Sequence, residues 1–131
     1  MNIEPGKPSD PRLLQGIDHF NRGEFFEAHE VWEDLWRDVP GDPDRTFYQG
    51  LIKAAVCCFH DSRGNRGGAK TMFGSAVAQL RPHGPAREGI DVARFLEDFR
   101  KWYGAAAAGP SDPVGGYPRI LRREGGEKEP A

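Results

Sequence analysis

Residues 20–38 read FNRGEFFEAHEVWEDLWRD, and this stretch decides the fold class. At 100° per residue, its aromatic and aliphatic side chains gather on one side of a helix, while acidic side chains lie opposite. The apolar side holds Phe25, Ala28, Trp32, Leu35 and Trp36, and the opposite side holds Glu27 and Asp34. The pattern predicts an amphipathic helix over about residues 24–38, whose apolar side must pack against other elements.

The same helical period recurs on both sides of this stretch. Caps and breakers bound four further helices, which we expect from Pro11 to about residue 22, over about 43–62, over about 68–80, and through 92–103. The segment 43–62 is apolar around more than half of its circumference, as is typical of the central helix of a bundle. Because no segment alternates apolar and polar residues over the length of a strand, we predict an all-α fold, a compact bundle of about five helices.

A weak internal repeat indicates how these helices pair. Gly23 precedes Ala28 by five residues, and Gly64 precedes Ala69 by the same number. Helix hairpins of the tetratricopeptide kind place such small residues where paired helices approach closely, although an array needs about three units. We therefore predict tetratricopeptide-like helix pairs in one compact bundle, with a single core that contains Trp32, Trp36, Phe59, Phe73, Phe95 and Phe99.

The length of 131 residues fits one domain. We expect a flexible lead-in over residues 1–9 and a single helical domain over 10–104. Residues 105–131 are rich in Gly, Pro and mixed charge and offer little to bury, so we expect them to form a mostly disordered tail.

The charge balance argues against several function classes. The chain has 18 Lys and Arg residues against 20 Asp and Glu, a net charge of −2, which disfavours a nucleic-acid binder and adhesion to an anionic membrane. No apolar run approaches the roughly 18 residues of a membrane-spanning helix, and residues 1–9 lack the layout of a signal peptide. Cys57 and Cys58 are adjacent, which disfavours an ordinary disulfide between them. We therefore expect a reduced, cytoplasmic protein without nucleic-acid or membrane partners.

Polar residues on the second and third predicted helices are candidates for a shared site. His29 and Glu33 lie one turn apart beside the apolar side of 24–38, and a narrow polar stripe runs along 43–62. A short turn joins the two helices, so they are antiparallel neighbours and the stripe can face His29 and Glu33. The predicted cluster is His29, Glu30, Glu33, Gln49, Lys53 and His60, and its predicted aromatic lining is Phe26, Trp32 and Trp36.

Three segments together resemble a known family. FNRGEFFEAHEVWE at 20–33, YQGLIKAAV at 48–56 and, after His60, GNRGGA at 64–69 are similar to the bacterial and archaeal family called domain of unknown function 309. The resemblance covers about residues 12–100 and implies a small cytoplasmic helical bundle, without an assigned activity. Where the usual motif reads Gln-Gly-Leu-Ile-Gln, this chain has Lys53, which places a cation in the predicted cluster.

Three interpretations of the cluster remain open. It is a buried polar network that fixes helix packing, a pocket for a small molecule or peptide, or a metal or general acid–base site. In the metal case His29, Glu33 and His60 hold zinc or another divalent cation. His-Glu-x-x-Glu at 29–33 differs from the His-Glu-x-x-His of zinc peptidases, which weakens the third. We favour a non-enzymatic binding or scaffold module without a cofactor, whose partner is a protein or small molecule. The alternative is a metal-dependent hydrolase.

The aromatic content also bears on assembly. Three Trp and eight Phe residues are more than one small core absorbs, and exposed apolar patches usually mark an interface. We therefore expect a homodimer.

Overall fold

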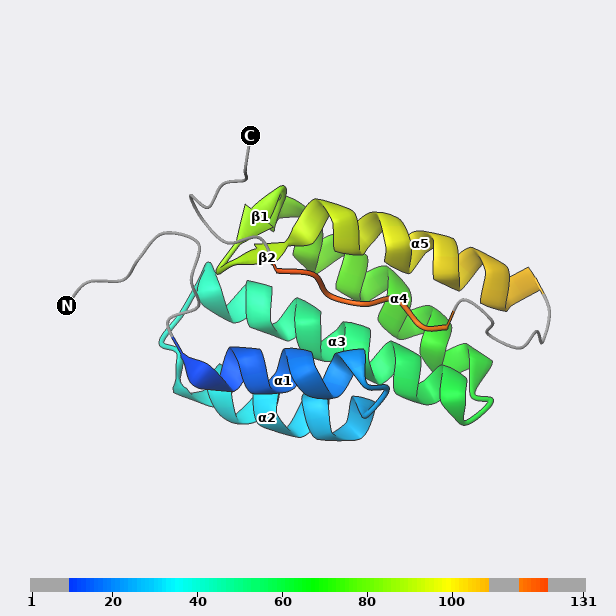
Figure 1. Cartoon of the computed structure of the whole chain (residues 1–131), viewed down its shortest axis with the longest axis horizontal. Helices are drawn as coiled ribbons and strands as arrows, with labels where there is room; N and C mark the ends of the chain where they lie inside the picture. The colour runs from blue at the N-terminus through cyan, green and yellow to red at the C-terminus, as the bar shows by residue number, and fades with distance from the viewer. Residues whose placement is uncertain (1–9, 109–115, 123–131) are drawn as a thin grey trace.

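A computed structural model describes residues 10–108 and 116–122. The predicted all-α fold is confirmed, because five α-helices account for most of this part of the chain (Figure 1). In chain order the elements are α1 (Pro11–Asn21), α2 (Phe25–Asp38), α3 (Asp44–Ser62), α4 (Arg66–Leu80), the 3-10 turn η1 (Arg81–His83), β1 (Ala86–Arg87), β2 (Ile90–Asp91) and α5 (Val92–Ala108).

One small hairpin was absent from the sequence prediction. Strands β1 and β2 pair antiparallel, with Ala86 opposite Asp91 and Arg87 opposite Ile90. The two residues between them, Glu88 and Gly89, have φ values of 53° and 78°, the left-handed conformation of a tight hairpin turn. Strands of two residues are too short to show an alternating pattern, so the sequence carried no sign of them.

The two hairpins α1–α2 and α3–α4 turn in the same way. Gly23 and Gly64 follow their first helices with φ values of +81° and +77°. The backbone N–H after each glycine donates to the carbonyl of His19 or His60, at 2.8 Å in both turns. This is the Schellman end of a helix, in which a residue free to adopt positive φ satisfies the last carbonyls. The predicted tetratricopeptide-like helix pairs are therefore confirmed.

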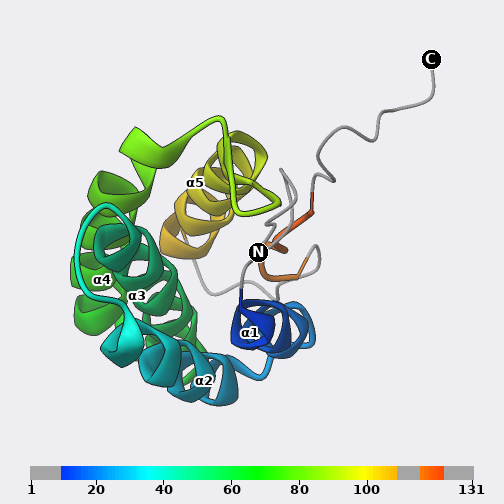
Figure 2. The same ribbon diagram turned by 90° about the vertical axis from the view of Figure 1, so that its left-hand side faces the viewer.

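The helices follow one another around an arc. Figure 2 shows α1, α2, α3 and α4 in sequence along this arc, with α5 on its inner side. Helix α3 packs against both α2 and α4 and buries nine of its residues, as expected of the central helix. Residues 116–122 run extended between α5 and α1 (Figures 1 and 2). Helix α5 and residues 116–122 thus lie on the inner side of the arc.

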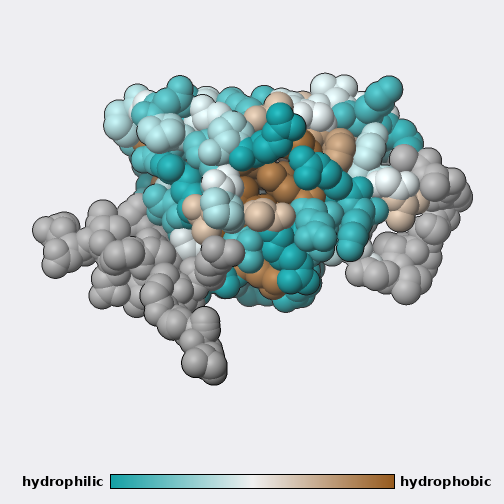
Figure 3. All heavy atoms as spheres, turned by 90° about the horizontal axis from the view of Figure 1, so that it is seen from above, coloured by the Kyte–Doolittle hydropathy of each residue, from teal (hydrophilic) through white to brown (hydrophobic). Residues whose placement is uncertain are grey.

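The predicted aromatic core is also confirmed. Trp32, Phe95 and Phe99 are buried, and Trp36, Phe59 and Phe73 are partly buried and pack against the same cluster. On the face where α4 and α5 lie, Figure 3 shows apolar side chains in a hollow surrounded by polar ones. The large hydrophobic side chains that are exposed in the described residues are Phe26 and Leu121. The bundle thus buries or partly buries most of the aromatic residues whose number led us to expect a homodimer. The homodimer itself stays a prediction.

The domain boundary predicted at residue 104 differs from the structure. Helix α5 continues to Ala108, and within residues 116–122 the Ile120 side chain is 1% exposed and belongs to the core. The predicted lead-in 1–9, and residues 109–115 and 123–131 of the predicted tail, lie outside the described residues. None of the helices in the described part of the chain is both long enough and apolar enough to cross a bilayer.

Both cysteines lie inside the bundle on α3. Cys57 and Cys58 are fully buried, and the Cys57 thiol donates to the carbonyl of Ala69 at 3.3 Å. Burial raises the pKa of Cys57 to about 12, and the charge of Asp61 adds to the rise. Burial also raises the pKa of Cys58. Because the thiolate is the reactive form, both residues should be inert in the folded protein.

We therefore expect an aromatic disulfide reagent at mildly alkaline pH to leave both thiols of the native protein unmodified. The same reagent in denaturing guanidinium should label two thiols per chain. Absorbance of the released thiolate measures both reactions, with the denatured sample as the control. Rapid labelling of either cysteine in protein with a native circular dichroism spectrum would contradict this burial.

Candidate functional site

The structure divides the six residues of the predicted polar cluster among three places. His29 Nε2 and Glu33 Oε2 lie 3.3 Å apart on α2, as predicted from their spacing. Glu33 also accepts a hydrogen bond from Arg37 at 3.2 Å, one turn further along the same helix. Glu30 is exposed on α2. The His29–Glu33 pair is thus a contact within one helix at the surface.

The polar stripe of α3 pairs with α4, so the predicted contact with α2 is wrong. Gln79 donates to Gln49 at 2.7 Å, and the Lys53 ammonium donates to the hydroxyl of Ser75 at 2.8 Å. The helical period determines which residues share one side of α3, but it does not determine which neighbour that side meets. Helix α3 lies between α2 and α4, and its polar side faces α4.

The third place is the turn between α3 and α4, where His60 lies. Its Nδ1 is 3.2 Å from the side-chain amide of Asn65, and Asn65 caps α4 by accepting from the N–H of Gly68 at 3.0 Å. Across residues 10–108 and 116–122, no three His, Cys, Asp or Glu side chains are grouped so that they could hold a metal ion. His29, Glu33 and His60, the set expected for a cation, are therefore not brought together.

The three aromatic residues predicted to line the cluster also have separate surroundings. Trp32 is fully buried and its indole N–H donates to the carbonyl of Leu13 on α1 at 3.2 Å. Phe26 is 48% exposed. The Arg45 guanidinium lies 3.9 Å from the ring centroid of Trp36. The three aromatic residues therefore have different partners: Leu13 of α1 for Trp32, Arg45 for Trp36, and His29 and Phe59 for Phe26.

The most elaborate constellation of contacts surrounds residues 116–122, which we call the strap. The side chain of Asn21, at the end of α1, makes two hydrogen bonds to the backbone of one strap residue. Its amide donates to the carbonyl of Ile120 at 2.9 Å, and its oxygen accepts from the N–H of Ile120 at 2.8 Å. One asparagine thus satisfies both backbone groups of a residue that is almost fully buried.

The hairpin holds the next two residues of the strap. The N–H of Asp91 donates to the carbonyl of Leu121 at 2.9 Å. Ile90 forms an isolated antiparallel bridge with Arg122. Strand β2 therefore pairs with β1 along one edge and offers backbone groups to the strap.

One side chain of the strap, that of Tyr117, contacts three other helices. The ring of Tyr117 packs edge-on against Phe25 of α2, with centroids 4.9 Å apart, and lies 5.4 Å from Trp102 of α5. Its hydroxyl donates to Asp61 of α3 at 3.1 Å. Burial raises the pKa of Tyr117 to about 12, and the charge of Asp61 adds to the rise. The phenol therefore stays protonated, and stays a donor, at neutral pH.

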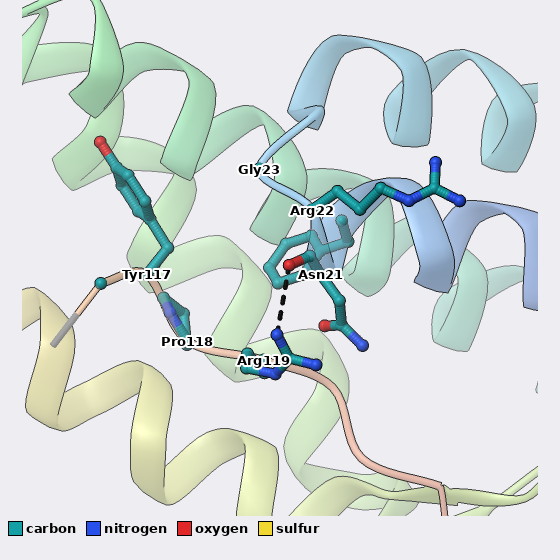
Figure 4. Close-up of a pocket in the computed structure, with 8 residues that line it drawn as sticks. Asn21, Arg22, Gly23, Tyr117, Pro118 and Arg119 are labelled. Carbon is teal, nitrogen blue, oxygen red and sulfur yellow. Dashed lines mark hydrogen bonds between the residues drawn. The ribbon is translucent and has the colours of Figure 1, made fainter.

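A pocket of about 290 Å³ adjoins the strap where α1 turns into α2. Figure 4 shows the strap passing the turn, with the Arg119 guanidinium donating to the backbone carbonyl of Asn21 at 3.4 Å. Six of the lining residues are Asn21, Arg22, Gly23, Tyr117, Pro118 and Arg119. We call the surface that holds the strap, together with this pocket, the strap site.

Sequence reasoning missed the strap site because its two halves are far apart in the chain. Asn21 and Ile120 are separated by 99 positions, and no local pattern links them. One signal was present in residues 20–38, since the polar residue Asn21 directly follows the last apolar residue of its helix. A polar residue at this position is equally typical of an ordinary helix end, so it does not indicate a binding site.

Together these features define a class of small all-α proteins made of two tetratricopeptide-like hairpins and a helix packed inside their arc. Residues 13–72 match the family described as Domain of unknown function (DUF309). This match agrees with the resemblance predicted from the sequence. The matched residues comprise most of α1, all of α2 and α3 and the first half of α4, so that α5 and the strap lie beyond them.

Two curated relatives are similar over part of the chain. The uncharacterized protein YpuF of Bacillus subtilis (strain 168) is 32% identical over 82 residues, which cover 61% of this chain and 47% of the relative. An uncharacterized protein of Aquifex aeolicus (strain VF5) is 26% identical over 81 residues, which cover 62% of this chain and 21% of the relative. The chain thus spans less than half the length of either relative.

Proposed function

We propose that this protein is a non-enzymatic binding module whose ligand is an extended polypeptide segment, bound at the strap site. The observation that carries the proposal is the pair of hydrogen bonds from Asn21 to the backbone of Ile120. Bonds to backbone groups are available to any extended peptide, whatever its sequence. Modules that capture peptides obtain affinity from such main-chain bonds and selectivity from pockets for side chains.

The position of the strap site in the fold also supports this function. The strap contacts α1 through Asn21, α2 through Phe25, α3 through Asp61, α5 through Trp102 and β2 through the N–H of Asp91. A segment that lies there touches elements from all along the chain. A site built on packed helices holds its ligand groups more rigidly than a site built on loops.

Three residues of the predicted polar cluster have structural partners. Gln49 and Lys53 join α3 to α4, and His60 lies beside the Asn65 cap. Buried or half-buried polar groups with such partners ordinarily fix helix packing. These contacts favour a binding module over the metal-dependent hydrolase considered from the sequence.

The test measures binding of a fluorescent peptide that has the strap sequence, residues 116–122. In the unchanged chain, the tethered strap competes at an effective concentration on the order of millimolar, so we expect little binding of micromolar peptide. Ile120→Asp places a charge where the strap is buried and should expel it. Fluorescence anisotropy should then show that the variant binds the peptide at least about tenfold more tightly than the unchanged chain.

Leu121→Asp provides the matched control, because Leu121 is the neighbouring apolar residue and is 37% exposed. Its strap should stay bound and should still block the peptide. Adding Asn21→Ala to Ile120→Asp should remove the gained binding. Circular dichroism verifies that each variant is folded, and Ile120→Ala replaces Ile120→Asp if the charge prevents folding. A folded, strap-weakened variant without measurable peptide binding would overturn the proposal.

A further inference from the structure

We infer that the strap site selects partner proteins with an exposed segment of the form aromatic–Pro–x–aliphatic, for which the strap is the built-in competitor. This inference rests on the proposed function and adds to it the side chains that the site recognises. The strap supplies the evidence, because each of its positions has a different environment within the fold.

The aromatic position is recognised on three sides. The Tyr117 ring lies between Phe25 of α2 and Trp102 of α5, and Asp61 accepts its hydroxyl proton in a hydrogen bond. Aromatic pairs in such edge-on and tilted arrangements contribute beyond the area that they bury. The Asp61 carboxylate favours tyrosine over phenylalanine here, because phenylalanine would leave this half-buried acceptor without the bond.

The next positions alternate between buried and exposed. Pro118 is buried and has no backbone N–H that would need a partner there, and its ring keeps the backbone extended. Arg119 is exposed. Ile120 is 1% exposed, whereas Leu121 is 37% exposed. The site therefore recognises mainly residues 117, 118 and 120 of the strap. Positions 119 and 121 contribute less, because Leu121 is exposed and Arg119 makes only one long hydrogen bond at the surface.

The pocket beside the strap gives a partner segment an advantage over the strap itself. Gly116 lines this pocket, and a Cβ atom built on it would meet no other atom within 4 Å. Its φ of +76° is accessible to glycine and costly for other residues. A partner segment could instead have a residue with negative φ and a side chain at the position of Gly116. That side chain would gain contacts with the turn at Gly23 that the strap lacks.

A peptide series on the folded Ile120→Asp protein tests the selectivity. The parent peptide has the sequence of residues 116–122, and four variants carry Tyr117→Ala, Ile120→Ala, Arg119→Ala or Leu121→Ala. We expect the first two changes to weaken binding at least about tenfold, because they empty buried positions. The last two should change the dissociation constant by less than about twofold. Leu121 is 37% exposed, and the exposed Arg119 side chain makes only a long hydrogen bond of 3.4 Å, to the carbonyl of Asn21.

The outcomes separate this inference from the proposed function. If all five peptides bind within about twofold of one another, the site binds extended segments but does not read their side chains, and the inference is overturned alone. A greater loss from Arg119→Ala or Leu121→Ala than from Ile120→Ala would overturn it as well. If the parent peptide fails to bind the folded variant, the proposed function fails with it. If the Ile120→Asp protein does not fold, the same five peptides are measured on the Ile120→Ala protein.

Discussion

Replacement of Gly16 by alanine should lower the free energy of unfolding by about 3 kcal/mol, because it forces a methyl group into a buried tryptophan. A Cβ atom on Gly16 would lie well inside the contact distance of Trp32, against its Nε1, Cδ1 and Cε2 atoms. The Trp32 ring cannot yield easily, since it is fully buried and donates to the carbonyl of Leu13. Moving it would distort the core and leave its N–H without a partner.

The matched control is Gly74→Ala on α4. Gly74 is exposed within a helix and has no atom within 4 Å of a built Cβ, so alanine there gains helix propensity without a clash. Glycine inside a helix costs about 1 kcal/mol relative to alanine, so this variant should be slightly more stable than the parent. Urea unfolding followed by tryptophan fluorescence compares the two. Equal midpoints for both variants would contradict the close approach of α1 to Trp32.

The helices were predictable because their signals are local. The apolar spacing in 20–38 predicts α2, and the repeated glycines at 23 and 64 predict two hairpins with matching turns. Neither prediction requires knowledge of what lies across the fold. The same is true of the aromatic core, since a residue on the apolar side of a helix becomes buried whichever neighbour covers it.

Contacts that depend on rotation or on distant residues were not predictable. The period of α3 places Gln49 and Lys53 on one side, but only packing decides that this side meets Gln79 and Ser75 of α4. The strap lies in a stretch rich in Gly, Pro and Arg. Nothing near Ile120 in the sequence reveals the asparagine 99 positions away that holds its backbone. For this reason the sequence predicted a site between α2 and α3, whereas the structure points to the strap.

The second large effect concerns α5, which lies outside the residues that match the family. Phe99 is fully buried, and its ring stacks against Phe95 and Trp102 and contacts Phe73 of α4 with centroids 5.0 Å apart. Truncation of a buried phenylalanine removes its transfer free energy and leaves a cavity. We expect Phe99→Ala to lower the free energy of unfolding by about 4 kcal/mol, measured by urea unfolding with circular dichroism.

Phe26→Ala is the control with identical chemistry at an exposed position. Phe26 is 48% exposed and loses only surface contacts with His29 and Phe59, so this variant should change stability by less than about 1 kcal/mol. A small effect of Phe99→Ala, close to that of Phe26→Ala, would mean that α1–α4 fold without α5 and that the helix is an appendage. A large, cooperative loss would mean that α5 is part of the same folding unit. The strap site would then be a property of the complete domain, because Trp102 reaches Tyr117 only when α5 fills the arc.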